Sequence, residues 1–231
     1  MRKKAFIVSA AIVILGLAGL ALFLSLGTGH TVYVPDEAAR LKDNAEFLLN
    51  KRRHTTDRVQ KAELLSQAIE KLKQALQIKP EFPVAHNLLG HCYIEKGQWE
   101  DARRHLEEAL RLRPDYPAAL FNRGTLYLRL GAARGGGELV EKAIADLQQA
   151  LQSELASAFA GDILKALAEA HQLQGDYDRA IARLEEYLKR SPNAPDWDLV
   201  ERKVRGLQLM KESRERNNGT NNGVTPPAEK P

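Results

Sequence analysis

The sequence predicts an all-α solenoid of stacked helix pairs that follows one N-terminal transmembrane helix. Three observations predict this arrangement: an uncharged apolar stretch near the N-terminus, a set of small and apolar residues that recurs every 34 residues, and prolines at regular places between amphipathic segments. We expect about four repeats and one C-terminal capping helix, because a helix pair cannot bury its apolar face alone and must stack on neighbours.

The N-terminal stretch at residues 5–26 holds 22 residues without a charge. As a helix it would be about 33 Å long, which matches a bilayer core of about 30 Å. A cleaved signal peptide is the competing interpretation. It usually has an apolar region of about 7–15 residues and a small-residue cleavage site, and neither is found here. We therefore expect a cytoplasmic stub at 1–4, an uncleaved transmembrane helix at 5–27 and a linker at 28–35.

The charges around this stretch predict its orientation. Arg2, Lys3 and Lys4 precede it directly, whereas the first charges after it are Asp36 and Glu37. Under the positive-inside rule the N-terminus stays in the cytoplasm and the remainder is exported. We therefore expect a single-pass protein of the cytoplasmic (inner) membrane, with its solenoid in the periplasm. The inverted topology, with a cytoplasmic solenoid, remains an alternative.

The net charge of +4 gives no indication of a binding partner for the solenoid, because the three N-terminal cations supply most of it. Along the rest of the chain, Lys and Arg alternate with Glu and Asp, which is typical of solvated helix surfaces. No basic block occurs beside a run of aromatic residues, so we expect no nucleic-acid partner. The single cysteine, Cys92, excludes an intrachain disulfide, and its apolar neighbours predict a buried thiol.

The repeat is visible as residues that return in the same order, 34 residues apart in the first two copies and further apart later, where the third repeat has extra residues. The first set and its copy 34 residues later are Ala68, Leu72, Ala75, Pro80 and Ala102, Leu106, Ala109, Pro114. Later copies are Ala143, Leu147, Ala150 and then Ala180, Leu184, Tyr187, Pro192. Gly90 and Tyr93 likewise return as Gly124 and Tyr127. The predicted solenoid covers 36–216, with repeats at about 36–80, 83–116, 117–157 and 161–194 and a cap helix at 195–214.

Prolines mark three of the junctions as P-x-x-P, beginning at Pro80, Pro114 and Pro192. The first proline of each motif cannot continue the preceding helix, and the second suits the first turn of the next one. Because helical patterns flank each motif, these prolines predict helix boundaries rather than a polyproline ligand.

The second repeat carries a family pattern: His86-x2-Leu89-Gly90-x2-Tyr93, then Ala102-x3-Leu106, then Pro114. This spacing resembles the tetratricopeptide repeat (TPR), whose pattern is W-x2-L-G-x2-Y, A-x3-F and P. The resemblance implies a curved trough whose inner wall comes from the first helix of each repeat. The residues it places on that wall are Asn87, His91, Phe121, Asn122, Thr125, Arg129, Lys165 and Glu169.

Such a trough suits an extended peptide or a helix, with Phe121 as an apolar anchor. One TPR subtype binds a peptide's terminal carboxylate through a fixed set of Lys, Asn and Arg residues. At the corresponding positions only Asn122 fits, so we do not expect that mode of binding.

Some segments depart from the pattern. The third repeat contains extra residues around 132–137, where the glycines predict a surface loop, and it lacks a closing proline. The first repeat has no glycine at the close-approach position, and a polar break at 54–57 divides its two helices. The tail at 217–231 is rich in Asn, Gly and Pro, which predicts disorder.

No enzyme motif was found. The six histidines form no H-E-x-x-H or Cys/His metal pattern, and the sequence has neither a G-x-S-x-G nor a Walker motif. We expect no catalytic residues, no metal and no cofactor.

The resulting hypothesis is a membrane-anchored scaffold or adaptor that recruits partner proteins to a cell-envelope complex, of the secretion, pilus or cytochrome-assembly type. The alternative is a homo-oligomeric structural protein that assembles through stacked solenoids.

Overall fold

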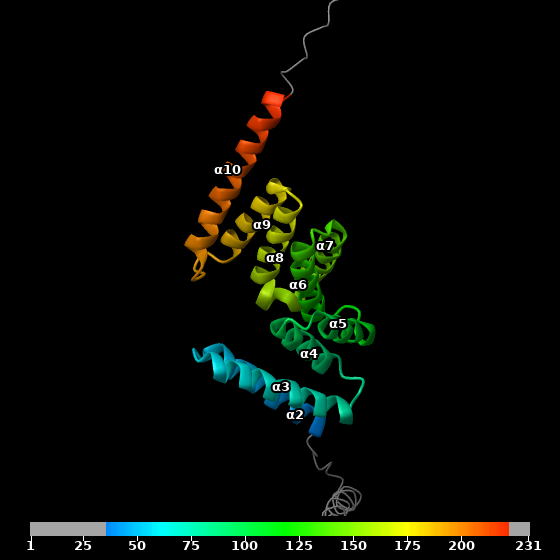
Figure 1. Cartoon of the computed structure of the whole chain (residues 1–231). Coiled ribbons are helices and arrows are strands. Elements are labelled where there is room, and N and C mark those ends of the chain that lie inside the picture. The colour runs from blue at the N-terminus through cyan, green and yellow to red at the C-terminus, as the bar shows by residue number, and fades with distance from the viewer. Residues whose placement is uncertain (1–35, 222–231) are drawn as a thin grey trace, which may run out of the picture.

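The computed structural model describes residues 36–221, and all regular secondary structure within this range is helical, without strands. The α-helices are α2 (Glu37–His54), α3 (Arg58–Ile78), α4 (Pro83–Lys96), α5 (Trp99–Leu112), α6 (Pro117–Arg134), α7 (Gly137–Gln152), α8 (Ala160–Leu173), α9 (Tyr177–Arg190) and α10 (Trp197–Asn221). A 3₁₀ helix, η1 (Glu154–Phe159), joins α7 to α8. The helix pairs stack in chain order along a curved path, with α2 and α3 at one end and α10 at the other (Figure 1). The predicted all-α, TPR-like solenoid is confirmed for the described residues.

The helix boundaries follow from side chains that satisfy or remove free backbone N–H groups. The Asp57 carboxylate caps α3, because it accepts from the backbone N–H of Val59 at 2.8 Å and of Gln60 at 3.2 Å. Pro83 and Pro117 occupy the first turns of α4 and α6, where a missing N–H costs nothing. The prolines at these junctions therefore act as helix boundaries, as predicted.

Two glycines allow the helices of a repeat to approach closely. A Cβ atom added at Gly90 would lie 2.5 Å from Cγ of Leu106, and one at Gly124 would lie 2.8 Å from Cγ of Leu147. Both leucines are fully buried. The recurring glycine is thus explained by packing, since any side chain there would push the facing helix away.

The loop predicted at 132–137 is shorter in the structure. Helix α6 continues through Arg134, and only Gly135 and Gly136 separate it from α7. Gly135 has φ 64°, a left-handed conformation that ends the helix. The helix persists because Ala132 and Ala133 favour helix, so most of the extra residues lengthen α6 and α7 instead of forming a loop.

The C-terminal helix is longer than the predicted cap at 195–214. Val200, Val204 and Leu207 form its buried stripe. Helix α10 continues to Asn221, past residue 217, where we expected disorder to begin. Residues 222–231 lie outside the described part of the chain.

Two long-range contacts hold the C-terminal half of α10 against the preceding helix pair. Lys211 Nζ lies 2.5 Å from Oδ1 of Asp178, and Arg214 Nη1 donates to the Gly175 carbonyl at 2.8 Å. Both acceptors belong to the α8–α9 connection or the first turn of α9. These contacts need the folded solenoid, and no local sequence signal reports them.

The predicted transmembrane helix at 5–27 lies outside the described residues. Within 36–221, no helix combines the length and the apolarity needed to span a bilayer.

Candidate partner-binding groove

A hollow of about 720 Å³ lies among α6, α8 and α10. We call it the α6–α8–α10 hollow. Its lining includes Phe121 and Thr125 from α6, Lys165, Ala166 and Glu169 from α8, and Leu199, Arg202 and Lys203 from α10. Four of the eight predicted groove residues, Phe121, Thr125, Lys165 and Glu169, therefore meet in one place.

The apolar part of the hollow is held in position by the irregular third repeat. The half-buried Phe121 ring packs against Phe159 at the end of η1, with ring centroids 5.8 Å apart. Leu199 faces the hollow from α10 and is 61% exposed. A large apolar side chain that remains this exposed beside an aromatic ring suits contact with an apolar group of a partner.

Lys165 has a structural role at the edge of the hollow. Its ammonium nitrogen lies 3.0 Å from Oδ2 of Asp196 and 3.2 Å from Oδ1 of Asp162. The Tyr187 hydroxyl also donates to Asp196. The bond from Tyr187, followed by the bond from Lys165, lowers the pKa of the Asp196 carboxyl. Lys165 thereby ties α8 to the segment that leads into α10, so most of its charge is already neutralised.

The two α10 cations that line the hollow have no such partners. Arg202 and Lys203 are exposed, and neither forms an ion pair within the part of the chain that the structure describes. The facing carboxylate of Glu169 is also exposed. Beyond the Lys165 network, the hollow therefore presents two cations and one anion around an apolar centre.

The other predicted groove residues lie closer to the N-terminal end. Asn87 is buried, and its Oδ1 accepts from Nδ2 of Asn122 at 2.8 Å, which joins α4 to α6. His91 is partly buried and lies 3.9 Å from Glu95, which in turn contacts Arg52 at 2.6 Å. Arg129 is exposed. The two asparagines thus join neighbouring repeats, and Asn87 is shielded from solvent.

The sequence interpretation missed the contribution of α10. Continuing the 34-residue spacing from Lys165 and Glu169 leads to Leu199 and Lys203. This signal was present, but the segment was interpreted only as a cap, because its buried stripe carries no glycine or tyrosine of the repeat pattern.

Three partly or fully buried histidines make the fold sensitive to acid. Burial is the main cause that lowers the pKa of His91 and of His171. It is also the main cause that lowers the pKa of His105, to about 4. An unfolded histidine has a pKa near 6.5, so below that pH the unfolded state binds more protons than the folded state. Stability is therefore lost as the pH falls from about 6.5 toward the folded-state values.

We expect the free energy of unfolding to fall by about 1–2 kcal/mol between pH 7 and pH 5. This decrease is set lower than full burial of three histidines would give, because the rings of His91 and His105 are partly exposed to solvent. Chemical denaturation at both pH values measures it. Replacement of the buried His171 by leucine should reduce the pH dependence, whereas His54→Gln, at an exposed position, should not. A pH-independent midpoint would contradict this prediction.

No group of three or more His, Cys, Asp or Glu side chains that could hold a metal ion was found in residues 36–221. The α6–α8–α10 hollow offers an apolar surface and charged side chains.

Comparisons with known proteins agree with this architecture. Family models described as tetratricopeptide repeat match residues 61–119 and residues 161–200. No curated protein matches the sequence.

Several solved structures share the fold. A thermophilic TPR protein of Thermus thermophilus is 23% identical with a TM-score of 0.52, over 74% of this chain and 92% of that one. Pseudomonas aeruginosa pilF is 18% identical with a TM-score of 0.60, over 82% of this chain and 79% of that one. The MamA protein is 17% identical with a TM-score of 0.52, over 84% of this chain and 98% of that one.

At these identities the likeness concerns the fold, and the repeat matches supply the family. The two matched segments include the helix pair α4–α5 and the helix pair α8–α9, and the intervening α6–α7 pair packs in the same way. The chain therefore belongs to the tetratricopeptide-repeat family.

Proposed function

We propose that this protein is a membrane-anchored scaffold that recruits a partner protein to a cell-envelope complex through the α6–α8–α10 hollow. TPR solenoids are protein-interaction scaffolds, and this hollow supports that role here. The observation that carries the proposal is the exposed Leu199 opposite Phe121, with unpaired cations alongside. An apolar anchor beside an adaptable charged rim is the usual composition of a peptide- or helix-binding groove.

The membrane part of the proposal rests on the sequence. The uncharged stretch at 5–26 has the length of a bilayer core, and the cations before it favour a cytoplasmic N-terminus. The solenoid would then lie in the periplasm. A reporter that is active only in the cytoplasm, fused after Pro231, should be inactive, and activity would show the opposite topology.

Site-specific photo-crosslinking tests the hollow in the full-length protein. A photoreactive amino acid in place of Thr125 should capture a discrete partner in cells. In that background, Leu199→Ala should reduce the captured partner about tenfold, because loss of an anchor side chain costs about 1.4 kcal/mol or more.

The matched control is Leu209→Ala. Leu209 lies on the same helix and is 64% exposed, close to the 61% of Leu199, but it does not line the hollow. This variant should capture the partner as the wild type does. Equal capture by the Leu199→Ala variant would contradict binding in the hollow.

A further inference from the structure

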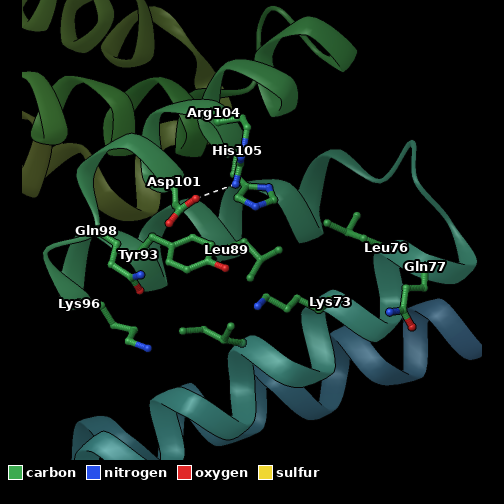
Figure 2. A pocket seen from close by; sticks show the side chains of 11 residues that line it. Lys73, Leu76, Gln77, Leu89, Tyr93, Lys96, Gln98, Asp101, Arg104 and His105 are labelled. Carbon is green, nitrogen blue, oxygen red and sulfur yellow. Dashed lines mark hydrogen bonds and ion pairs between the residues drawn. The ribbon is translucent and has the colours of Figure 1, made fainter.

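A second hollow, of about 630 Å³, lies between the first two repeats. We call it the α3–α4–α5 hollow. Its apolar floor is formed by Ile69 and Leu89, and Tyr93 lies beside Leu89. Lys73 extends from α3 toward Leu89 and Tyr93 of α4 (Figure 2). None of these residues lines the α6–α8–α10 hollow, so the two sites are independent.

Cations reach this hollow from three helices. Lys73 lies on α3, Lys96 on α4 and Arg104 on α5. The one carboxylate that lines the hollow, Asp101, is already bonded to Arg104 at 2.6 Å. Lys73 and Lys96 form no ion pair with any residue in 36–221. Unpaired like charges that converge on one hollow attract an anion, which here would also contact an apolar floor.

His105 adds a ring nitrogen that can take up a proton when that anion binds. The Pro80 carbonyl can only accept, so Nε2 of His86 donates to it at 3.0 Å. In the neutral His86 ring, Nδ1 is then an acceptor, and Nδ1–H of His105 donates to it at 3.0 Å. The remaining nitrogen of His105, Nε2, keeps a free lone pair. It can take a proton without breaking the bond to His86.

The charged and titratable neighbours of His105 come from each helix packed against it. They are His86 and the stacked Tyr93 on α4, Asp101 and Arg104 on α5, and Lys73 on α3. The pKa of His105 is lowered to about 4, mainly by burial and also by His86, Arg104 and Lys73, while Asp101 opposes the shift. His105 is therefore neutral at pH 7 in a locally positive environment.

We infer that the α3–α4–α5 hollow binds an oxyanion carried on a peptide segment with apolar neighbours. The oxyanion is either a carboxylate or a phosphate. Lys73 and Lys96 hold the anion, the apolar floor takes the adjacent side chain, and His105 accepts a proton at Nε2 when the anion is present. For a carboxylate, which keeps its charge over this range, binding should therefore strengthen as the pH falls from 7.5 to 5.5.

Histidine-ring NMR of the full-length protein in detergent micelles tests this inference. Three probes are titrated separately: inorganic phosphate, a capped Leu-Glu-Leu peptide and the same peptide with phosphoserine in place of Glu. We expect at least one probe to shift the His105 ring signals and to raise the pKa of His105. The probe that binds best distinguishes a phosphate from a carboxylate ligand.

The double variant Lys73→Gln, Lys96→Gln should bind that probe about tenfold more weakly. The control is Lys51→Gln, Lys189→Gln, which makes the same charge change at two exposed lysines outside the hollow and should bind as the wild type does. No response of His105 to any probe would overturn the inference. An equal loss of binding in both double variants would also overturn it, because it would show nonspecific charge attraction only.

Discussion

Replacement of Asp146 by alanine is expected to lower the free energy of unfolding by about 3–5 kcal/mol. Asp146 lies on α7 with its side chain 9% exposed, and its two oxygens accept from Nε and Nη2 of Arg123 on α6, both at 2.7 Å. The bond to Asp146 is the main cause that raises the pKa of Arg123. Without the Asp146 carboxylate, the largely buried guanidinium has no carboxylate bonded to it, which is the costly outcome.

Denaturation followed by far-UV circular dichroism measures this loss, and α7 also provides the control. Glu138 pairs with Lys142 at 2.7 Å, but its side chain is 79% exposed. Glu138→Ala should leave the stability almost unchanged, because the pair is exposed to solvent. The double variant Arg123→Leu, Asp146→Leu should recover much of the loss, since no unpaired charge remains. A loss below about 1 kcal/mol for Asp146→Ala alone would contradict the assigned role of this pair.

Replacement of Leu147 by alanine should lower the free energy of unfolding by about 3 kcal/mol, because a fully buried leucine is exchanged for a cavity. The facing residue, Gly124, makes this prediction more specific. A Cβ atom at Gly124 would lie 2.8 Å from Cγ of Leu147 and 3.2 Å from the Ala143 carbonyl oxygen. Gly124→Ala should therefore destabilise the wild type by about 1–2 kcal/mol, since overpacking exceeds the gain in helix propensity.

In the Leu147→Ala background the same glycine change should stabilise the protein, because the leucine atoms closest to the new methyl group are gone. A double-mutant cycle measures this reversal of sign. Gly206→Ala on α10 is the control: no atom lies within 4 Å of its Cβ position, so a gain of up to about 1 kcal/mol is expected. If Gly124→Ala had the same effect in both backgrounds, close packing against Leu147 would not explain the recurring glycine.

The candidate site could be predicted from the sequence only in part. The resemblance to the tetratricopeptide repeat placed Phe121, Thr125, Lys165 and Glu169 on the inner wall, and the structure brings these four together in one hollow. The spacing could not show that Asn87 is buried against Asn122, nor that Lys165 is bonded to two aspartates. Most of these contacts join residues of different repeats, and a periodic pattern does not report such contacts.

Local rules were sufficient for the helix pairs. The 34-residue spacing, the prolines at Pro83 and Pro117 and the glycines at Gly90 and Gly124 act within one repeat or between adjacent helices, so they can be recognised in a short window of sequence. Tertiary structure alone decided how α8, α9 and the segment before α10 share the Lys165–Asp196–Tyr187 network. It also decided how three helices direct cations into the α3–α4–α5 hollow. Those arrangements depend on the small rotation between successive repeats, which accumulates along the solenoid and results from the packing of all the repeats together.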